Sequence, residues 1–226
     1  MSSVPALVTA HLTDALGTTP QKASVTFLGV EPIDVLRFAA LRRAQGADER
    51  APGTGKQTRA TVKRAQAKRA QEPGEAEVVF ATVGCSRHPM HDPSDLAPDP
   101  VRGPRAELVV RLRPTTALPG LHKSLATVAA APAVEGLILG EDSLIDLQEP
   151  LWGGAICSAL LLSGDSGIDD LVLDAPADPV RFLRAVPITA NEAAWVRLKG
   201  ADALREAWSE AGVDVTDPTR GGVTPS

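Results

Sequence analysis

The sequence predicts an α+β fold: one sandwich-like domain over residues 1–226, built on a mixed or antiparallel sheet with covering helices. Short apolar segments rich in β-branched residues recur between glycine, proline and aspartate residues, as is typical of strands. Helical patterns do not alternate strictly with these segments, which argues against a parallel βαβ architecture. Apolar residues make up 43% of the 226 residues and charged residues 23%, a balance that allows a sizeable core.

The N-terminal part of the chain is predicted to hold a helix and then strands. The helix covers 7–16 and ends at Gly17. Strands over 24–28 and 33–38 follow, because both segments are short, apolar and partly β-branched. A third strand, over 77–83, carries apolar side chains along most of its length and is therefore expected to be buried.

Residues 107–113 show the two-residue period of a strand. The inward positions are Leu108, Val110 and Leu112, and the outward positions are Glu107, Val109, Arg111 and Arg113. Because alternate side chains point to opposite faces of a sheet, we expect one face of this strand to lie in water.

A helix that begins at Pro119 is predicted to cover the sheet, since Leu121, Leu125 and Val128 share one helical face. Pro132 is expected to end this helix, because proline interrupts helical hydrogen bonding. Four further apolar segments are set off by glycine, proline and aspartate and are predicted as strands. They are 134–139, 155–162, 168–173 and 182–186.

Two more helices are predicted near the C-terminus. Thr189 and Glu192 have the spacing of a capping box, which begins the first of them. The second carries Leu204 and Trp208 on one face and ends at Gly212.

Positive charge is concentrated in residues 42–72, which we interpret as a flexible basic insertion between two strands. Within residues 42–71, nine lysines and arginines stand against Asp48 and Glu49, with no Leu, Ile, Phe or Trp to form a core element. Nucleic-acid binding through this insertion is an alternative. The absence of aromatic residues for base stacking and the charge of −11 over 72–226 argue against it. Residues 218–226 are expected to form a disordered tail.

The chain is predicted to be cytoplasmic and without a membrane segment. The longest run that is apolar apart from one serine, 155–162, is eight residues long, whereas a spanning helix needs roughly 20. The first residues include no cationic stretch of the kind found in secretory signals. Cys85 and Cys157 cannot build a disulfide framework, which fits a reducing compartment.

The densest group of potentially reactive side chains lies within residues 82–92. Its candidate metal ligands or nucleophiles are Cys85, His88, His91 and Asp92. A zinc site needs ligands from distant parts of the chain, and a nucleophilic cysteine needs oxyanion donors and an orienting group; no motif supplies either. We interpret the segment as a strand-to-loop corner held by Gly84 and Pro89, with no metal, cofactor or catalytic residue. An enzyme that uses Cys85 and His88 is the alternative.

Six motifs, taken together, make the chain resemble the bacterial branch of the Suppressor of fused domain family. They are VFATVGCSRHPM at 79–90, RAELVV at 105–110, the helix end at 125–126, PAVEG at 132–136, LWGG at 151–154 and AVPIT at 185–189. The family signature, a binding site or a structural corner, is Gly84, Cys85, Ser86, Arg87, His88, Pro89, Met90, Glu107, Trp152, Gly153 and Gly154. The basic insertion has no counterpart in the family pattern.

The resemblance implies an α+β domain that works by binding rather than by catalysis. Animal relatives hold a peptide of a transcription factor, and bacterial relatives are associated with immunity against toxins. The expected function is therefore a non-enzymatic protein-binding module, with an immunity protein as the specific hypothesis. Its partner would be another protein, with a basic toxin domain as the candidate, because the acidic part of the chain would attract a basic surface.

Overall fold

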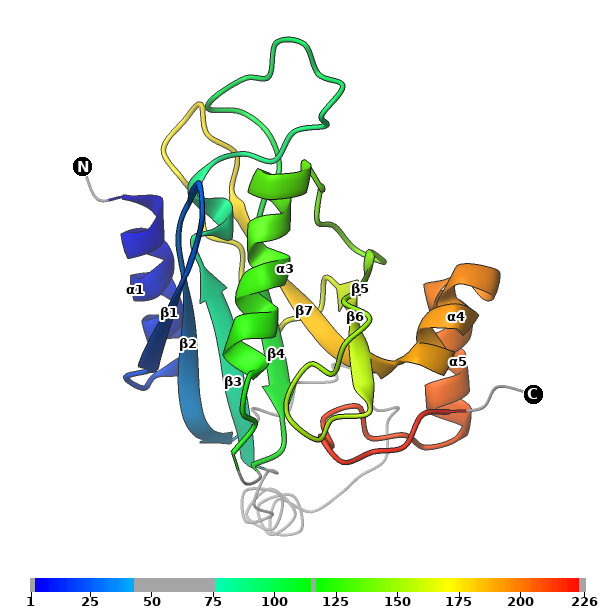
Figure 1. Cartoon of the computed structure of the whole chain (residues 1–226). Helices are drawn as coiled ribbons and strands as arrows, with labels where there is room; N and C mark the ends of the chain where they lie inside the picture. The colour runs from blue at the N-terminus through cyan, green and yellow to red at the C-terminus, as the bar shows by residue number, and fades with distance from the viewer. Residues whose placement is uncertain (1–2, 43–75, 115–116, 224–226) are drawn as a thin grey trace, which may run out of the picture.

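The computed structural model describes residues 3–42, 76–114 and 117–223 (Figure 1). Its helices are α1 (Val4–Leu16), the 3-10 turn η1 (Cys85–Arg87), α3 (Leu121–Glu135), α4 (Ala190–Lys199) and α5 (Ala201–Glu210). Its strands are β1 (Gln21–Phe27), β2 (Val30–Arg42), β3 (Ala76–Val83), β4 (Arg105–Leu112), β5 (Leu144–Asp146), β6 (Cys157–Ser163) and β7 (Val180–Thr189). Of the predicted basic insertion, residues 43–72 lie outside the described residues.

The described strands form a seven-stranded mixed sheet, which confirms the predicted α+β class. The strand order is β1-β2-β3-β4-β7-β6-β5. β4 and β7 pair in parallel, with Arg105 opposite Val180, and the other neighbouring strands pair antiparallel. Since β4 and β7 start at the same end of the sheet, the loops that precede them also meet at that end (Figure 1).

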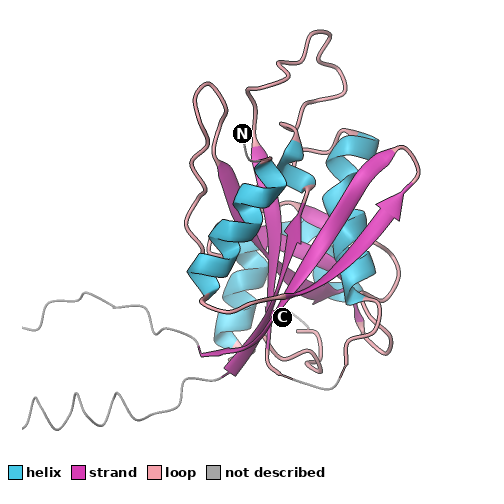
Figure 2. Ribbon diagram, turned by 90° about the vertical axis from the view of Figure 1, so that its left-hand side faces the viewer, coloured by secondary structure: helices cyan, strands magenta, loops and turns pink. Residues whose placement is uncertain are grey.

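Helices cover both faces of the sheet (Figure 2). On one face, α3 packs against a core that includes Val35, Leu108 and Leu160. On the other face, α1 packs over Phe38 and Phe182, while α4 and α5 pack on a separate cluster over β6 and β7. None of the described helices has the length and apolar character needed to cross a membrane.

The expectation that β4 has one face in water is wrong. Glu107 and Val109, at the predicted outward positions, are both fully buried. Val109 belongs to the core beneath α1, because that helix covers the second face of the central strands. A two-residue period shows only that apolar and other side chains alternate along the strand. Whether the second face is in contact with water depends on the helix packed against it, here α1.

Two of the predicted boundaries around α3 also differ from the structure. The helix does not end at Pro132 but continues to Glu135, and Gly136 N–H donates to the Pro132 carbonyl at 3.1 Å. The last turns bury Ala129, Ala130 and Ala131 against the sheet, which offsets the hydrogen bond that proline cannot make. Because α3 takes up the start of 134–139, no strand forms there.

The segment 168–173 is not a full strand. It contributes one isolated bridge, in which Leu171 and Val180 exchange both backbone hydrogen bonds at 2.9 Å. Within the segment Asp169 and Asp170 are exposed, whereas Ile168 is buried in the core beneath α1, so the chain crosses this face of the sheet as a loop. The short strand β5, which no sequence pattern indicated, completes the opposite edge of the sheet.

The described part of the expected disordered tail is docked. Arg220 is 8% exposed, and its guanidinium bonds to the fully buried Glu192 of α4 and to the Pro187 carbonyl of β7. Thr216, two residues before the expected tail, is buried too, and its carbonyl accepts a hydrogen bond from Arg113 N–H at 2.8 Å. Residues 224–226 lie outside the described residues.

Candidate functional site

The signature corner forms where β3 and β4 separate. Their regular pairing stops at Ala81 and Val109, and beyond it the Thr82 hydroxyl accepts a hydrogen bond from Leu108 N–H at 2.8 Å. Gly84 then turns the chain with a φ of 125°, a region that favours glycine. A Cβ at this position would also approach the Ile33 side chain to 3.2 Å, so the turn requires glycine on two grounds.

Glu107 holds the corner from beneath. Its fully buried carboxylate accepts hydrogen bonds from the Thr82 hydroxyl (2.7 Å), Gly84 N–H (2.8 Å), Ser86 N–H (3.0 Å) and the Ser86 hydroxyl (2.6 Å). The hydrogen bonds from these four donors compensate for the hydrogen bonds to water that the carboxylate loses on burial. The arrangement gives Glu107 a structural role in shaping the corner.

Arg105 ties the same corner to the next loop. The guanidinium, in a residue that is 5% exposed, donates to the carbonyls of Ser86 (2.8 Å), Arg87 (3.0 Å) and Val101 (3.1 Å). Burial lowers the pKa of Arg105 from its ordinary value, although nearby Asp178 opposes that change. Together, Arg105 and Glu107 bind polar backbone groups of η1, and His88, the residue directly after it, is exposed to solvent.

A cavity of about 210 Å³ lies over this corner. Its walls come from the β1–β2 turn, the start of β2, the corner and the last turns of α3. The lining residues are Gly29, Val30, Glu31, Ile33, Gly84, Cys85, Arg87, His88, Pro89, Met90, Ala129, Pro132 and Ala133. Charged groups meet at one wall, where Glu31 Oε2 lies 3.2 Å from Arg87 Nε and 3.4 Å from His88 Nε2. The cavity is thus mostly apolar, with one cluster of charged side chains.

The structure places the signature residues at two opposite ends of the sheet. Residues 84–90 form the corner with Glu107 beneath it, whereas Trp152, Gly153 and Gly154 lie beside the start of α3. There Gly153 N–H donates to the Pro119 carbonyl at 2.8 Å, and the three residues line a separate cavity of about 250 Å³. A single site therefore does not contain the whole signature.

The geometry of Cys85 does not fit a nucleophile. Burial, followed by the negative charge of Glu107, raises the pKa of the Cys85 thiol well above its ordinary value. Burial also raises the pKa of Cys157 to about 11. The His88 ring is largely exposed and faces Glu31, and no hydrogen bond joins it to Cys85 in the described structure. Since the thiolate is the nucleophile, the corner lacks an activated cysteine.

We expect both cysteines to resist alkylation in the native protein. A thiol with a pKa near 11 is ionised in about one molecule per thousand at pH 8, and both side chains are buried. Iodoacetamide at pH 8, followed by mass spectrometry, should label neither residue within minutes, whereas both should react in urea. Rapid labelling of Cys85 in folded protein would contradict this expectation and favour the enzyme alternative.

No metal centre is evident in the described ranges. Within 3–42, 76–114 and 117–223, no three His, Cys, Asp or Glu side chains are grouped so that they could hold a metal ion. His91 and Asp92 stand next to the corner in sequence, but Asp92 bonds locally to Ser94 N–H at 2.8 Å. These hydrogen bonds with Ser94 lower the pKa of Asp92, as is expected for a loop turn.

The end of the sheet that carries the corner, here called the corner end, exposes an unusual set of side chains. Two loops reach it, 91–104 before β4 and 164–179 before β7, and Gly103 N–H joins them through the Asp178 carboxylate at 2.6 Å (Figure 1). The exposed large apolar residues at this end are Leu28, Leu96, Val101, Val134, Ile138 and Val172. The acidic residues of the two loops are Asp92, Asp95, Asp99, Asp165, Asp169, Asp170, Asp174 and Asp178, against the single basic Arg102.

The acidic residues at 141, 142 and 146 add little net negative charge to the surface, because each is ion-paired with an arginine. Glu141 pairs with Arg181, Asp142 with Arg205 at 2.5 Å and Asp146 with Arg197 at 2.6 Å. The hydrogen bond from Arg197 lowers the pKa of Asp146. At the corner end only Asp165 among the loop aspartates is named in an ion pair, with Arg184 at 3.2 Å, so the two loops there keep an excess of acidic residues.

Sequence reasoning missed the partners that complete the corner cavity. Glu31, at the start of β2, and Ala129 and Ala133, on α3, come from elements far from the signature in the sequence. No local pattern indicates that these segments meet, so only the pairing of β2 with β3 and the packing of α3 could reveal it.

The fold and its corner define a class: an α+β protein with a mixed seven-stranded sheet, helices on both faces and a buried glutamate that holds a strand-to-loop turn. Residues 57–221 match the family described as Suppressor of fused protein (SUFU), and this range begins inside the basic insertion, for which the motifs indicated no counterpart. The chain belongs to this family, which confirms the resemblance seen in the motifs.

Solved structures of the family share the fold. A putative SUFU homolog from Neisseria gonorrhoeae FA 1090 matches with a TM-score of 0.58 and 15% identity over 99% of this chain and 98% of its own. The Sufu–Fu complex matches with a TM-score of 0.59 and 16% identity over 97% and 92%. Drosophila Suppressor of Fused matches with a TM-score of 0.55 and 17% identity over 95% of this chain and 49% of its own. A comparison with curated protein sequences gave no match.

Proposed function

We propose that this chain is a bacterial immunity protein, which works without catalysis by binding a toxin protein in the cytoplasm. Family membership supports a binding role, since one of the matched structures is a complex between Sufu and Fu. The raised thiol pKa values of Cys85 and Cys157 argue against the alternative of a cysteine enzyme. Both thiols are free, which fits a reducing compartment.

The exposed apolar and acidic side chains of the corner end are the main support for this proposal. Leu96 and Leu28 are fully exposed and Val172 is 81% exposed, although such side chains are more commonly covered by a partner or a core. The two loops that reach this end carry eight aspartates and one arginine, and one of these aspartates, Asp165, is paired with Arg184 of β7 at 3.2 Å. Apolar side chains within a charged rim are the pattern of a protein interface, and the sign of the charge selects a basic partner.

The corner cavity adds an anchor point to this surface. Its walls include the turn that carries Leu28 and the end of α3 that carries Val134, so exposed apolar groups lie around its opening. A side chain from a basic toxin domain could enter the cavity and meet Glu31 there. Interface energy is usually concentrated in a few such pockets.

We expect the double substitution Asp169→Lys and Asp170→Lys to slow association with the toxin by about tenfold, because it reverses charge at the corner end. The partner is first obtained by affinity capture from the native host, and its toxicity and neutralisation are tested by co-expression. Association rates measured by biolayer interferometry at several salt concentrations should show a weaker salt dependence for the variant.

The matched control is Glu206→Lys with Glu210→Lys on α5, where both side chains are exposed and the charge change is the same. It should leave the association rate within about twofold, because screening weakens effects beyond about 8 Å at physiological salt. Equal slowing by the two variants would contradict the assigned surface. A captured partner without toxicity would contradict the immunity role.

A further inference from the structure

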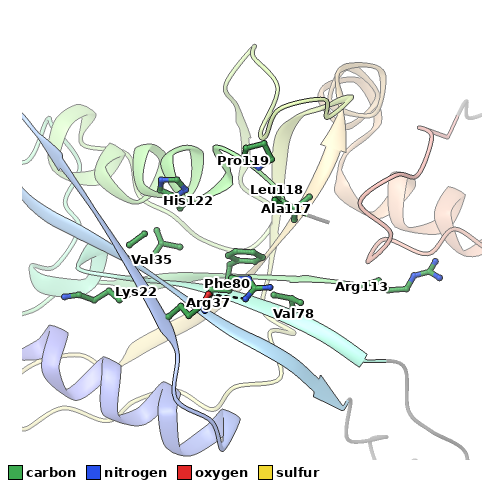
Figure 3. Close-up of a pocket in the computed structure, with 12 residues that line it drawn as sticks. Lys22, Val35, Arg37, Val78, Phe80, Arg113, Ala117, Leu118, Pro119 and His122 are labelled. Atoms are coloured by element: carbon green, nitrogen blue, oxygen red, sulfur yellow. Dashed lines mark hydrogen bonds between the residues drawn. The ribbon is translucent and has the colours of Figure 1, made fainter. Parts of the chain in front are cut away.

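A second concave site lies at the end of the sheet opposite the corner end. A cleft of about 520 Å³ opens between β1, β2, β3 and the first turn of α3 (Figure 3). Its floor is apolar: Val35, Val78 and Phe80 are each at most 8% exposed. The volume lies in the range of about 300–1,000 Å³ that is usual for ligand pockets.

The charged residues of this cleft are all basic. They are Lys22, Arg37 and Arg113, His122 is a further basic side chain, and no acidic residue is among the described lining residues. Lys22 is ion-paired with Asp34 at 3.0 Å. Arg113 is ion-paired with Asp214 at 2.5 Å and points away from the floor (Figure 3). The positive charge that faces the cleft therefore comes chiefly from Arg37.

Arg37 occupies a position that the strand pattern would give to an apolar residue. It follows Ile33 and Val35 at two-residue spacing on the face of β2 that α3 covers, and its side chain is half-buried. Its guanidinium donates to the neutral Gln21 Oε1 at 3.3 Å, and no carboxylate pairs with it in the part of the chain that the structure describes. A partly buried cation without a counter-ion favours an anion from outside.

The opposite wall favours the same ligand chemistry. His122 lies in the first turn of α3, where the positive end of the helix dipole favours negative charge. Leu118 and Pro119 extend the apolar surface from that wall toward the floor. A ligand that fills the cleft would thus need an apolar group for the floor and a carboxylate for Arg37.

We propose that this cleft binds an acidic peptide segment of a partner protein, with a carboxylate on Arg37 and an adjacent apolar side chain on Val78 and Phe80. Charge complementarity selects the acidic peptide, whereas the corner end, with its aspartates, selects a basic surface. The site goes beyond the proposed immunity function, and it can be tested without knowledge of the toxin.

The test uses a random dodecapeptide library displayed on phage and selected on the full-length protein. We expect enrichment of peptides that place Asp, Glu or a C-terminal carboxylate beside a large apolar residue. The best peptide is synthesised with a fluorescent label, and its Kd is measured by fluorescence anisotropy. Replacing its carboxylate with an amide, or making the Arg37→Gln variant, should each weaken binding at least about tenfold, as is usual for hydrogen bonds to charged groups.

Combining the two changes should weaken binding little more than either change alone, because both remove the same contact. Lys199→Gln, which removes an exposed charge from α4, is the matched control and should leave the Kd unchanged. Ala117→Glu, at the exposed rim, should also weaken binding and provides a second variant if Arg37→Gln does not fold.

Three results would overturn the proposal. One is selection of peptides without acidic residues, and another is an amide peptide that binds as tightly as its carboxylate form. The third is loss of binding in the Asp169→Lys and Asp170→Lys variant, since the peptide would then occupy the corner end. Failure of the toxin experiment leaves all of these measurements unaffected, so the two proposals fail separately.

Discussion

Replacing Arg220 with alanine is expected to lower the free energy of unfolding by about 3–5 kcal/mol, as is usual when one partner of a buried ion pair is removed. Glu192 is fully buried, and its carboxylate lies 2.8 Å from Arg220 Nη1 and 2.8 Å from Trp208 Nε1. Without Arg220 the carboxylate keeps neutral donors but loses its cation. Urea unfolding followed by tryptophan fluorescence measures the change.

The matched control is Arg205→Ala, which removes a partly exposed arginine from its pairs with Asp142 and Asp202. Exposed ion pairs contribute about 0–1 kcal/mol, so this variant should stay close to wild type. An Arg220→Ala loss as small as that of the control would mean that residues 213–223 do not stabilise α4 and α5.

The same ion pair predicts how stability depends on pH. Burial alone would raise the pKa of Glu192, but hydrogen bonds from Arg220, Thr189 N–H and Trp208 outweigh it and lower the pKa below 4.5. A carboxyl whose pKa is lower in the folded state contributes stability above its unfolded pKa, and this contribution is lost as the pH falls through the folded value. Wild-type stability should therefore decline below about pH 4.5, and Glu192→Gln should show a shallower decline.

Replacing Glu107 with alanine is expected to destabilise the fold by about 4 kcal/mol, because it leaves two buried N–H groups, at Gly84 and Ser86, without acceptors at about 1–3 kcal/mol each. The hydroxyls of Thr82 and Ser86 also lose their acceptor. Urea unfolding measures the total effect. Hydrogen exchange, read by NMR, should show faster exchange at the Gly84 and Ser86 amides.

Two further variants separate the role of the carboxylate from that of side-chain volume. Glu107→Gln keeps the size but offers one acceptor oxygen, so it should lose less stability than alanine does. Thr82→Ser keeps the hydroxyl that links Glu107 to Leu108 N–H, and should cost about 1 kcal/mol or less, since it removes only one methyl group. Wild-type stability in Glu107→Ala would contradict the structural role of this residue.

Local patterns identified most of the secondary structure because they depend on neighbours in the sequence. The capping box of α4 is present as predicted: Glu192 N–H donates to the Thr189 hydroxyl, and Thr189 N–H donates to the Glu192 carboxylate. Both groups lie within one helical turn, so no distant residue is needed to form it. The strands β1 to β4, β6 and β7 were likewise predicted, with differences at their ends.

Other features could not be predicted because they depend on which segments pack together. Glu107 has the spacing of an outward residue, yet the divergence of β3 and β4 brings the corner amides onto its carboxylate. Trp152 belongs to the same family signature as the corner but lies at the opposite end of the sheet. The order of these residues in the sequence does not indicate that they lie at opposite ends of the sheet.

The sequence by itself determined the α+β class, the order of most strands and helices, and the family. Those properties follow from hydrophobic period, turn residues and motif spacing, which are all local. Only the tertiary structure decided that Arg220 is an internal counter-ion and that Arg37 faces an apolar cleft. A charged side chain has the same local pattern whether it meets water or a buried partner, so its environment depends on segments that are distant in the sequence.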